Sequence, residues 1–169
     1  ALENFNLPPY LPELSSMFLK SDTVPLLVKG LQTFIEYPEY VIQGIRALTG
    51  FAARCDEAKE KISSPEIMTI VHESTQKHNN ADVLHVCSTF VATLADGETS
   101  SISDFMIEHG AVDLLLFSME CCPDEKVQDA ACLALRNLSC HVKNPEELLK
   151  DDKTLKFVVG AMDTHRNSV

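Results

Sequence analysis

The segment VQDAACLALRNL, residues 127–138, carries a helical pattern from which the architecture can be predicted. Its apolar residues recur at i, i+4, i+7, i+8 and i+11, as on one face of an α-helix: Val127, Ala131, Ala134, Leu135 and Leu138. The same face recurs 44 residues earlier as Val83, Cys87, Phe90, Val91 and Leu94. A further 43 residues back it reads Tyr40, Gly44, Ala47, Leu48 and Phe51. Helical periodicity repeated at this spacing predicts an all-α solenoid, an architecture that more often holds other molecules than performs chemistry.

A second, shorter amphipathic helix is predicted before each long helix. In the third copy its apolar face is Val112, Leu115, Leu116 and Met119, and in the second it is Ile67, Ile70, Val71 and Ser74. The first copy reads Val24, Leu27, Val28 and Leu31, and a fourth reads Leu155, Val158, Val159 and Met162. No long helix follows the fourth copy within the 169 residues. The prediction is therefore about three repeats plus a truncated fourth.

Helix-start signals support these boundaries, and a short helix is predicted to open each unit. Ser64-Pro65-Glu66 and Asn144-Pro145-Glu146 each put a capping side chain before a proline at the first helical position. We predict short helices at 14–20, 56–62, 103–109 and 145–150, within repeats at about 14–54, 55–97, 101–142 and 145–169. Residues 1–13 are predicted to be an extended lead-in, because the three prolines of Leu7–Pro12 prevent a continuous helix. A docking segment is the alternative for this stretch.

The charge balance argues against a nucleic-acid partner. The chain has 25 acidic and 14 basic residues, a net charge of −11, whereas binding to phosphates requires a basic face. A basic peptide partner fits this charge, and so does a domain that is merely soluble. No apolar run approaches the roughly 18 residues that span a membrane, so no membrane partner is expected. The six cysteines form no CxxC pair, and we expect reduced thiols in a cytoplasmic protein, with the nucleus as a second location.

The third copy resembles an armadillo repeat. The resemblance is carried by Gly110-Ala111-Val112-Asp113-Leu114-Leu115, by Val127-Gln128-Asp129-Ala130-Ala131 and by Ala134-Leu135-Arg136-Asn137-Leu138-Ser139. The first and second copies match this family in pattern, and its three-helix unit of about 42 residues agrees with the spacing. The resemblance implies a right-handed α-solenoid that acts as a non-enzymatic scaffold for a protein partner. HEAT repeats, which have two helices per unit, are the nearest alternative.

The resemblance also implies a binding surface. In armadillo proteins the long helices line a concave groove, where an Asn near the helix end binds the backbone of an extended peptide, and Asn137 matches that position. The Trp that often accompanies this Asn is replaced by Leu133, Thr89 and Arg46, so the grip of nuclear-import receptors on basic peptides is not implied. Counting back along the helices gives the predicted partner-binding face: Asn137, Leu133, Asp129, Lys126, Thr93, Thr89, His85, Asp82, Arg46, Ile42 and Glu39. A face that is merely solvated is the alternative.

The sequence contains no pattern typical of a catalytic or cofactor site. His85 and Cys87 are two residues apart on a helix and so point in different directions. Cys140-His141 has no second ligand pair at zinc spacing, and Cys121-Cys122 reads as an ordinary helix end. No Gly-rich phosphate loop, GxSxG or HExxH motif is present. We therefore expect no enzyme activity, no metal and no cofactor.

Two functions remain after these exclusions. The first is a scaffold that binds a protein segment along the long helices. The second is a structural or oligomerisation segment of a larger multidomain signalling or cytoskeletal protein, with no peptide in the groove.

The chain begins with Ala1 and its fourth copy lacks a long helix, so we expect a piece of a longer array. The apolar face Leu155, Val158, Val159 and Met162 is then a bare edge, through which we expect weak self-association.

Overall fold

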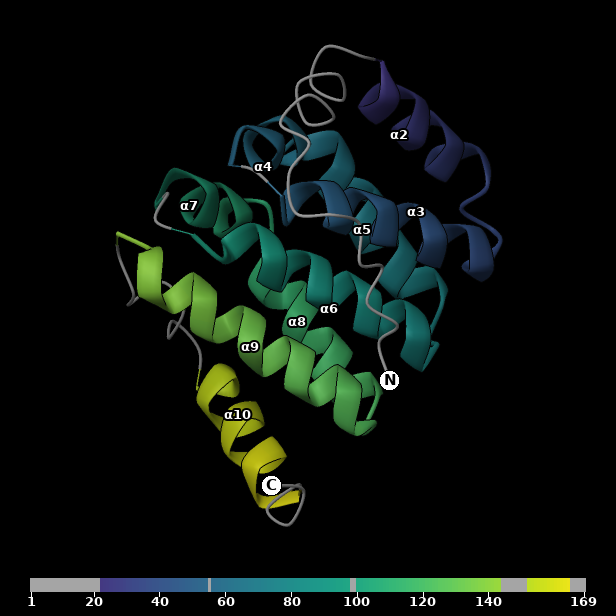
Figure 1. Ribbon diagram of the computed structural model, residues 1–169. Coiled ribbons are helices and arrows are strands. Elements are labelled where there is room, and N and C mark those ends of the chain that lie inside the picture. The colour runs from purple at the N-terminus through teal and green to yellow at the C-terminus, as the bar shows by residue number, and fades with distance from the viewer. Residues whose placement is uncertain (1–21, 55, 98–99, 144–151, 165–169) are drawn as a thin grey trace.

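All secondary structure in the described part of the chain is α-helical (Figure 1). A computed structural model describes residues 22–54, 56–97, 100–143 and 152–164. The helices in these ranges are α2 (Thr23–Thr33), α3 (Pro38–Ala52), α4 (Asp56–Ile62), α5 (Pro65–Lys77), α6 (Ala81–Ala95), α7 (Ser100–Glu108), α8 (Ala111–Cys121), α9 (Glu125–His141) and α10 (Lys153–Thr164). The predicted order of short, middle and long helices is confirmed for α4–α5–α6 and α7–α8–α9. The lead-in 1–13 and the predicted short helices at 14–20 and 145–150 lie outside the described residues.

Side-chain caps fix where several of these helices begin. The hydroxyl oxygen of Ser64 accepts a hydrogen bond from the Ile67 amide at 3.3 Å, and Pro65 takes the first helical position of α5. Asn80 and Asp124 cap α6 and α9 in the same way, each accepting from the amide two residues later. A capping oxygen satisfies an amide that has no partner inside the helix. The polar residues between the apolar stretches therefore set the boundaries of the elements.

The long helices lie side by side in chain order (Figure 1). Helix α6 packs along α3 on one side and along α9 on the other. The middle helices follow the same order, because α2 contacts α5, α5 contacts α8, and α8 contacts α10. Helix α6 is consequently covered from both sides, and ten of its fifteen residues are buried. The predicted core faces of α6 and α9 are confirmed, since every residue of both faces is buried.

The predicted core face of the first long helix was wrong by one residue. Tyr40 is 60% exposed, while the buried face of α3 consists of Val41, Ile45, Leu48 and Ala52. These residues precede their α6 counterparts by 42 positions, not 43. The periodicity did not distinguish the two choices, because both faces of this helix are apolar or small.

The predicted core face of α5 is confirmed, since all four of its residues are buried, and so is that of α2, where Leu27 packs against the core; α8 and α10 show a shift like that of α3. The buried residues of α8 are Ala111, Leu114, Leu115, Ser118 and Met119, whereas Val112 and Leu116 are only half-buried. In α10, Thr154 is buried and Phe157, Val158 and Ala161 pack against the core, while Leu155 and Val159 are 61% and 48% exposed. The side chain of Met162 lies outside the described part. The prediction of these two faces was wrong because polar residues occupy core positions. The hydroxyl of Ser118 donates a hydrogen bond to the Leu114 carbonyl at 2.9 Å, so the side chain can be buried without leaving a polar group unpaired.

Candidate functional site

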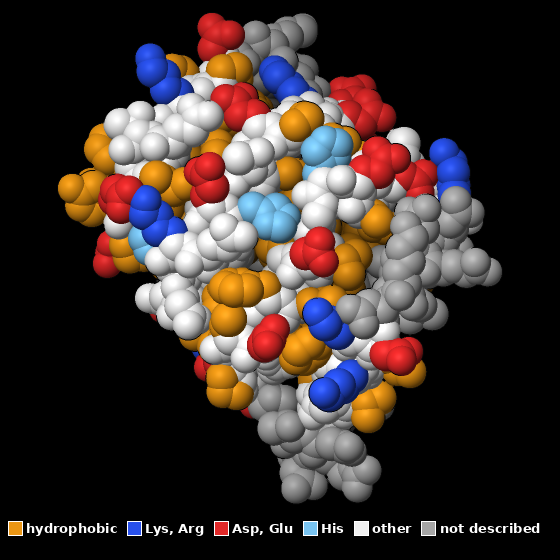
Figure 2. Space-filling view, turned by 180° about the vertical axis from the view of Figure 1, so that it is seen from behind, with side chains coloured by type: hydrophobic (Ala, Val, Ile, Leu, Met, Phe, Trp, Pro, Cys, Tyr) orange, Lys and Arg blue, Asp and Glu red, His pale blue; other side chains and the backbone are white. Residues whose placement is uncertain are grey.

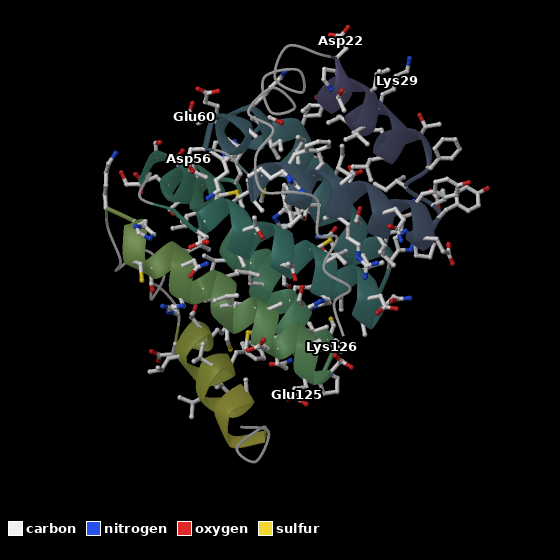
Figure 3. All side chains as sticks on the ribbon, viewed as in Figure 1. Asp22, Lys29, Asp56, Glu60, Glu125 and Lys126 are labelled. Atoms are coloured by element: carbon white, nitrogen blue, oxygen red, sulfur yellow. The ribbon has the colours of Figure 1, made fainter. Side chains whose placement is uncertain are left out.

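The predicted partner-binding residues of α6 and α9 form two adjacent rows. On α6 the row is Asp82, His85, Thr89 and Thr93, and on α9 it is Lys126, Asp129, Leu133 and Asn137. We call these eight residues the long-helix surface. Lys126 and its neighbour Glu125 lie where α9 begins, at the opposite end of the molecule from Asp56 and Glu60 of α4 (Figure 3). Since α6 and α9 pack along each other, the two rows are close in space although they are 44 residues apart in sequence.

Two hydrogen bonds, each from a side chain of one row to a backbone carbonyl of the other helix, join α6 and α9. The His85 ring donates from Nδ1 to the carbonyl oxygen of Lys126 at 3.1 Å. The Asn137 amide donates from Nδ2 to the carbonyl oxygen of Ala92 at 3.0 Å. The side chain of Asn137 is half-buried, so its orientation is fixed by a neighbouring helix. One N–H of Nδ2 is used within the protein, which leaves the second N–H to donate and Oδ1 to accept a bond from a partner.

The threonines of this surface also bond within the chain. The Thr89 hydroxyl donates to the His85 carbonyl at 2.8 Å, and the Thr93 hydroxyl donates to the Thr89 carbonyl at 2.9 Å. Asp82, Lys126, Asp129 and Leu133 are exposed, Leu133 to 43% of its surface. The surface therefore offers both signs of charge around one exposed apolar side chain.

The predicted residues of the first long helix do not continue these rows directly. With the spacing of 42 residues, the α3 positions that correspond to the α6 row are Tyr40, Gln43, Ala47 and Phe51. Glu39 and Arg46 are exposed, and each precedes one of these positions by one residue. Ile42 packs against the core. An aromatic residue, Tyr40, thus takes the position that Asp82 holds on α6.

Tyr40 belongs to an exposed aromatic cluster that the sequence patterns did not reveal. The rings of Phe34 and Tyr40 are stacked with centroids 5.1 Å apart, and Tyr37 contacts both at 6.5 and 6.0 Å. Their exposed fractions are 43% for Phe34, 55% for Tyr37 and 60% for Tyr40. The three aromatics recur every third residue across the turn between α2 and α3, which is the signal that would have identified them.

Three of the described cysteines have raised thiol pKa values, and several of the described histidines bond to the backbone. Burial raises the pKa of the Cys87 thiol far above its usual range, and desolvation also raises the pKa values of Cys121 and Cys132. A protonated thiol is neither a nucleophile nor a metal ligand. The histidines bond to backbone carbonyls of neighbouring units: His72 to Gly110 at 3.0 Å and His78 to Ile35 at 2.6 Å.

The described ranges show neither a metal-ligand cluster nor a membrane-spanning helix. Within the described ranges, no three His, Cys, Asp or Glu side chains come together as metal ligands would. No helix found there is long and apolar enough to cross a lipid bilayer. The face opposite to that of Figure 1 shows acidic and basic side chains interspersed, with histidines near its middle (Figure 2).

Residues 100–140 match the family model described as Armadillo/beta-catenin-like repeat. This range covers α7, α8 and nearly all of α9, which is one complete unit of short, middle and long helices. No curated protein and no solved structure matches the chain significantly. The resemblance carried by Gly110–Leu115 and Val127–Ser139 is confirmed by this match. The chain therefore contains an armadillo repeat at residues 100–140.

Proposed function

We propose that this chain is a non-enzymatic scaffold that binds a protein segment along its long helices. Armadillo repeats are generally protein-interaction scaffolds, and the match at residues 100–140 is the observation that carries the proposal.

We further propose a right-handed α-solenoid of about three armadillo-like repeats plus a partial fourth. The side-by-side order of α3, α6 and α9, with α2, α5, α8 and α10 alongside, supports it. The free thiols among the described cysteines agree with a cytoplasmic protein, with the nucleus as a second location.

The long-helix surface suits an extended segment of mixed polarity. Asn137 is held by its bond to Ala92, so its Oδ1 is an acceptor already oriented for a backbone N–H of the partner. Leu133, 43% exposed, offers an apolar anchor one turn away. Lys126 and Asp129 add one charge of each sign near the start of α9. Preorganised acceptors and a central apolar anchor are typical of residues that contribute most to binding.

Substituting Leu133 and Asn137 of α9 together should weaken binding without unfolding the protein. We expect Leu133→Ala with Asn137→Ala to reduce affinity about tenfold or more, equivalent to about 1.4 kcal/mol. The probe is a set of peptides selected on the wild-type chain from a random library displayed on phage, with affinities measured by fluorescence anisotropy. Thermal melting followed by circular dichroism shows whether the double variant stays folded.

Gln76→Ala is the matched control for the peptide experiment. Gln76 carries the same carboxamide as Asn137 but is exposed on α5, a middle helix. The control should bind the selected peptides as the wild type does. If peptides bind the Leu133/Asn137 variant with unchanged affinity, the long-helix surface is not the binding site.

An oligomerisation segment is the second candidate function, and the exposed side of α10 favours it. Leu155 and Val159 lie one turn apart and are 61% and 48% exposed. We expect wild-type sedimentation coefficients to rise with concentration, and Leu155→Ser with Val159→Ser to abolish that rise, because exposed apolar patches tend to be covered. Lys156→Ser, on the same helix and also exposed, is the control. A wild-type chain that stays monomeric at high concentration excludes this function for α10.

A further inference from the structure

The aromatic cluster Phe34, Tyr37 and Tyr40 borders an uncharged groove between α2 and α3. The groove holds about 280 Å³, and its lining residues include Leu26, Leu27, Gly30, Phe34, Tyr40 and Gln43. Leu26 is 67% exposed, which makes it more exposed than any of the three rings. No lining residue is charged, although the chain as a whole has a net charge of −11. Clustered exposed apolar side chains of this kind are a feature that interaction sites share.

The chemistry of the groove defines what fits it. Exposed aromatic rings beside a shallow apolar groove are the usual receptor for proline-rich segments, whose rings stack on them. Such segments adopt a polyproline II helix, which is extended before binding and therefore loses little conformational entropy. That helix has three residues per turn, so prolines three residues apart present their rings on the same side. The ligand should thus be short, uncharged and proline-containing.

The chain itself contains such a segment. Residues Leu7-Pro8-Pro9-Tyr10-Leu11-Pro12 include three prolines and no charged side chain. Pro9 and Pro12 are three residues apart and so fall on one side of a polyproline II helix. Leu11 and Tyr10 supply further apolar surface. The neutrality of both the groove and the segment means that no charge must be removed from water when they meet.

The connection is long enough for this segment to reach the groove. Residues 13–21 separate it from Asp22, which lies where α2 begins, the end of this helix remote from Phe34 (Figure 3). Nine residues extend to about 30 Å, whereas α2 between Asp22 and Phe34 is only about 18 Å long at 1.5 Å per residue. A short tether also gives the segment an effective concentration in the millimolar range at the groove. At this concentration even a weak contact is occupied.

We propose that Leu7–Pro12 binds within its own chain over the groove bordered by Phe34, Tyr37 and Tyr40. The segment covers the exposed end of the α2–α3 pair and stacks its prolines on the aromatic rings. This contact is independent of the proposed function, because it involves neither α6 nor α9. It assigns a binding surface and a ligand class, an uncharged proline-rich segment, to the N-terminal edge of the described helices.

Tyrosine signals report on this contact with little background. The chain contains three tyrosines and no tryptophan, and the three are Tyr10 in the segment and Tyr37 and Tyr40 in the cluster. In the isotope-labelled chain of residues 1–169, we expect nuclear Overhauser effects between protons of Pro9 or Pro12 and ring protons of Tyr37 or Tyr40. Relative to cross-peaks within one helix, these effects should keep their intensity over a tenfold dilution. Cross-peaks from the Leu11 methyl protons to the same rings should be present in the wild type and lost in the variant Pro9→Ala with Pro12→Ala.

Each outcome of this experiment decides the proposal. Pro123→Ala, at an exposed turn before α9, is the control and should retain all the cross-peaks. Absence of cross-peaks between the segment and the cluster in the wild-type chain overturns the proposal. Cross-peaks that disappear on dilution also overturn it, because they show that a second copy, and not the same chain, supplies the segment. Backbone amide spectra of both variants show whether α2 and α3 remain folded.

Discussion

Replacing Phe90 by alanine should lower the free energy of unfolding by about 3–5 kcal/mol, the usual cost of removing a buried phenylalanine. Phe90 is fully buried in α6, the helix enclosed between α3 and α9. Removing its ring leaves a cavity that two neighbouring helices cannot both close, because each is held by further contacts. Urea denaturation followed by far-ultraviolet circular dichroism measures the change.

Two companion variants make the Phe90 result interpretable. Phe90→Leu removes less volume and should cost about 1–1.5 kcal/mol, which keeps the effect measurable if the alanine variant does not fold. Phe34→Ala removes the same atoms from a side chain that is 43% exposed. It should lower the free energy of unfolding by about 1 kcal/mol, because stacking with Tyr40 is lost. Equal losses at positions 34 and 90 would contradict the central place of α6.

The helices themselves were largely predictable from local signals. The short helix at 56–62 was predicted with the bounds that α4 has, and the cap at Ser64 and Pro65 fixed the start of α5. Such signals act within one turn of helix and need no tertiary context. What periodicity could not assign was which of two adjacent apolar faces is buried. Ser118 and Thr154 occupy buried positions. A pattern of apolar residues does not include them, because their side chains are polar.

The candidate site was predictable only in part. Because each long helix repeats the last, the pattern correctly placed Thr93 and Asn137 on adjacent helices that pack together. It did not reveal that Asn137 Nδ2 bonds to Ala92, a residue 45 positions away, since that contact depends on how closely α6 and α9 approach. The aromatic cluster was missed for a different reason. The periodicity predicts Tyr40 to be a core residue because tyrosine is apolar enough to satisfy a helical pattern. Its exposure follows from the one-residue shift of α3.

Replacing Gly110 by alanine should lower the free energy of unfolding by about 2–3 kcal/mol, the sum of backbone strain and one lost hydrogen bond. Gly110 lies between α7 and α8 with a φ of 81°, a left-handed conformation that residues with a Cβ rarely adopt. A Cβ there would lie 2.9 Å from Nε2 of His72. That nitrogen donates to the Gly110 carbonyl at 3.0 Å, so the imidazole that must move is the one joining α5 to the armadillo repeat at residues 100–140.

Gly50→Ala is the matched control for Gly110→Ala, because it adds the same atoms without strain. Gly50 lies inside α3, and nothing is within 4 Å of where its Cβ would be. Alanine there should stabilise the protein by about 0.5–1 kcal/mol, since glycine is the weaker helix former. Gly110→Asn should recover part of the loss, because asparagine tolerates a left-handed backbone better than alanine does. Equal stability of Gly110→Ala and wild type would show that this turn adopts another conformation and that His72 does not join the two units there.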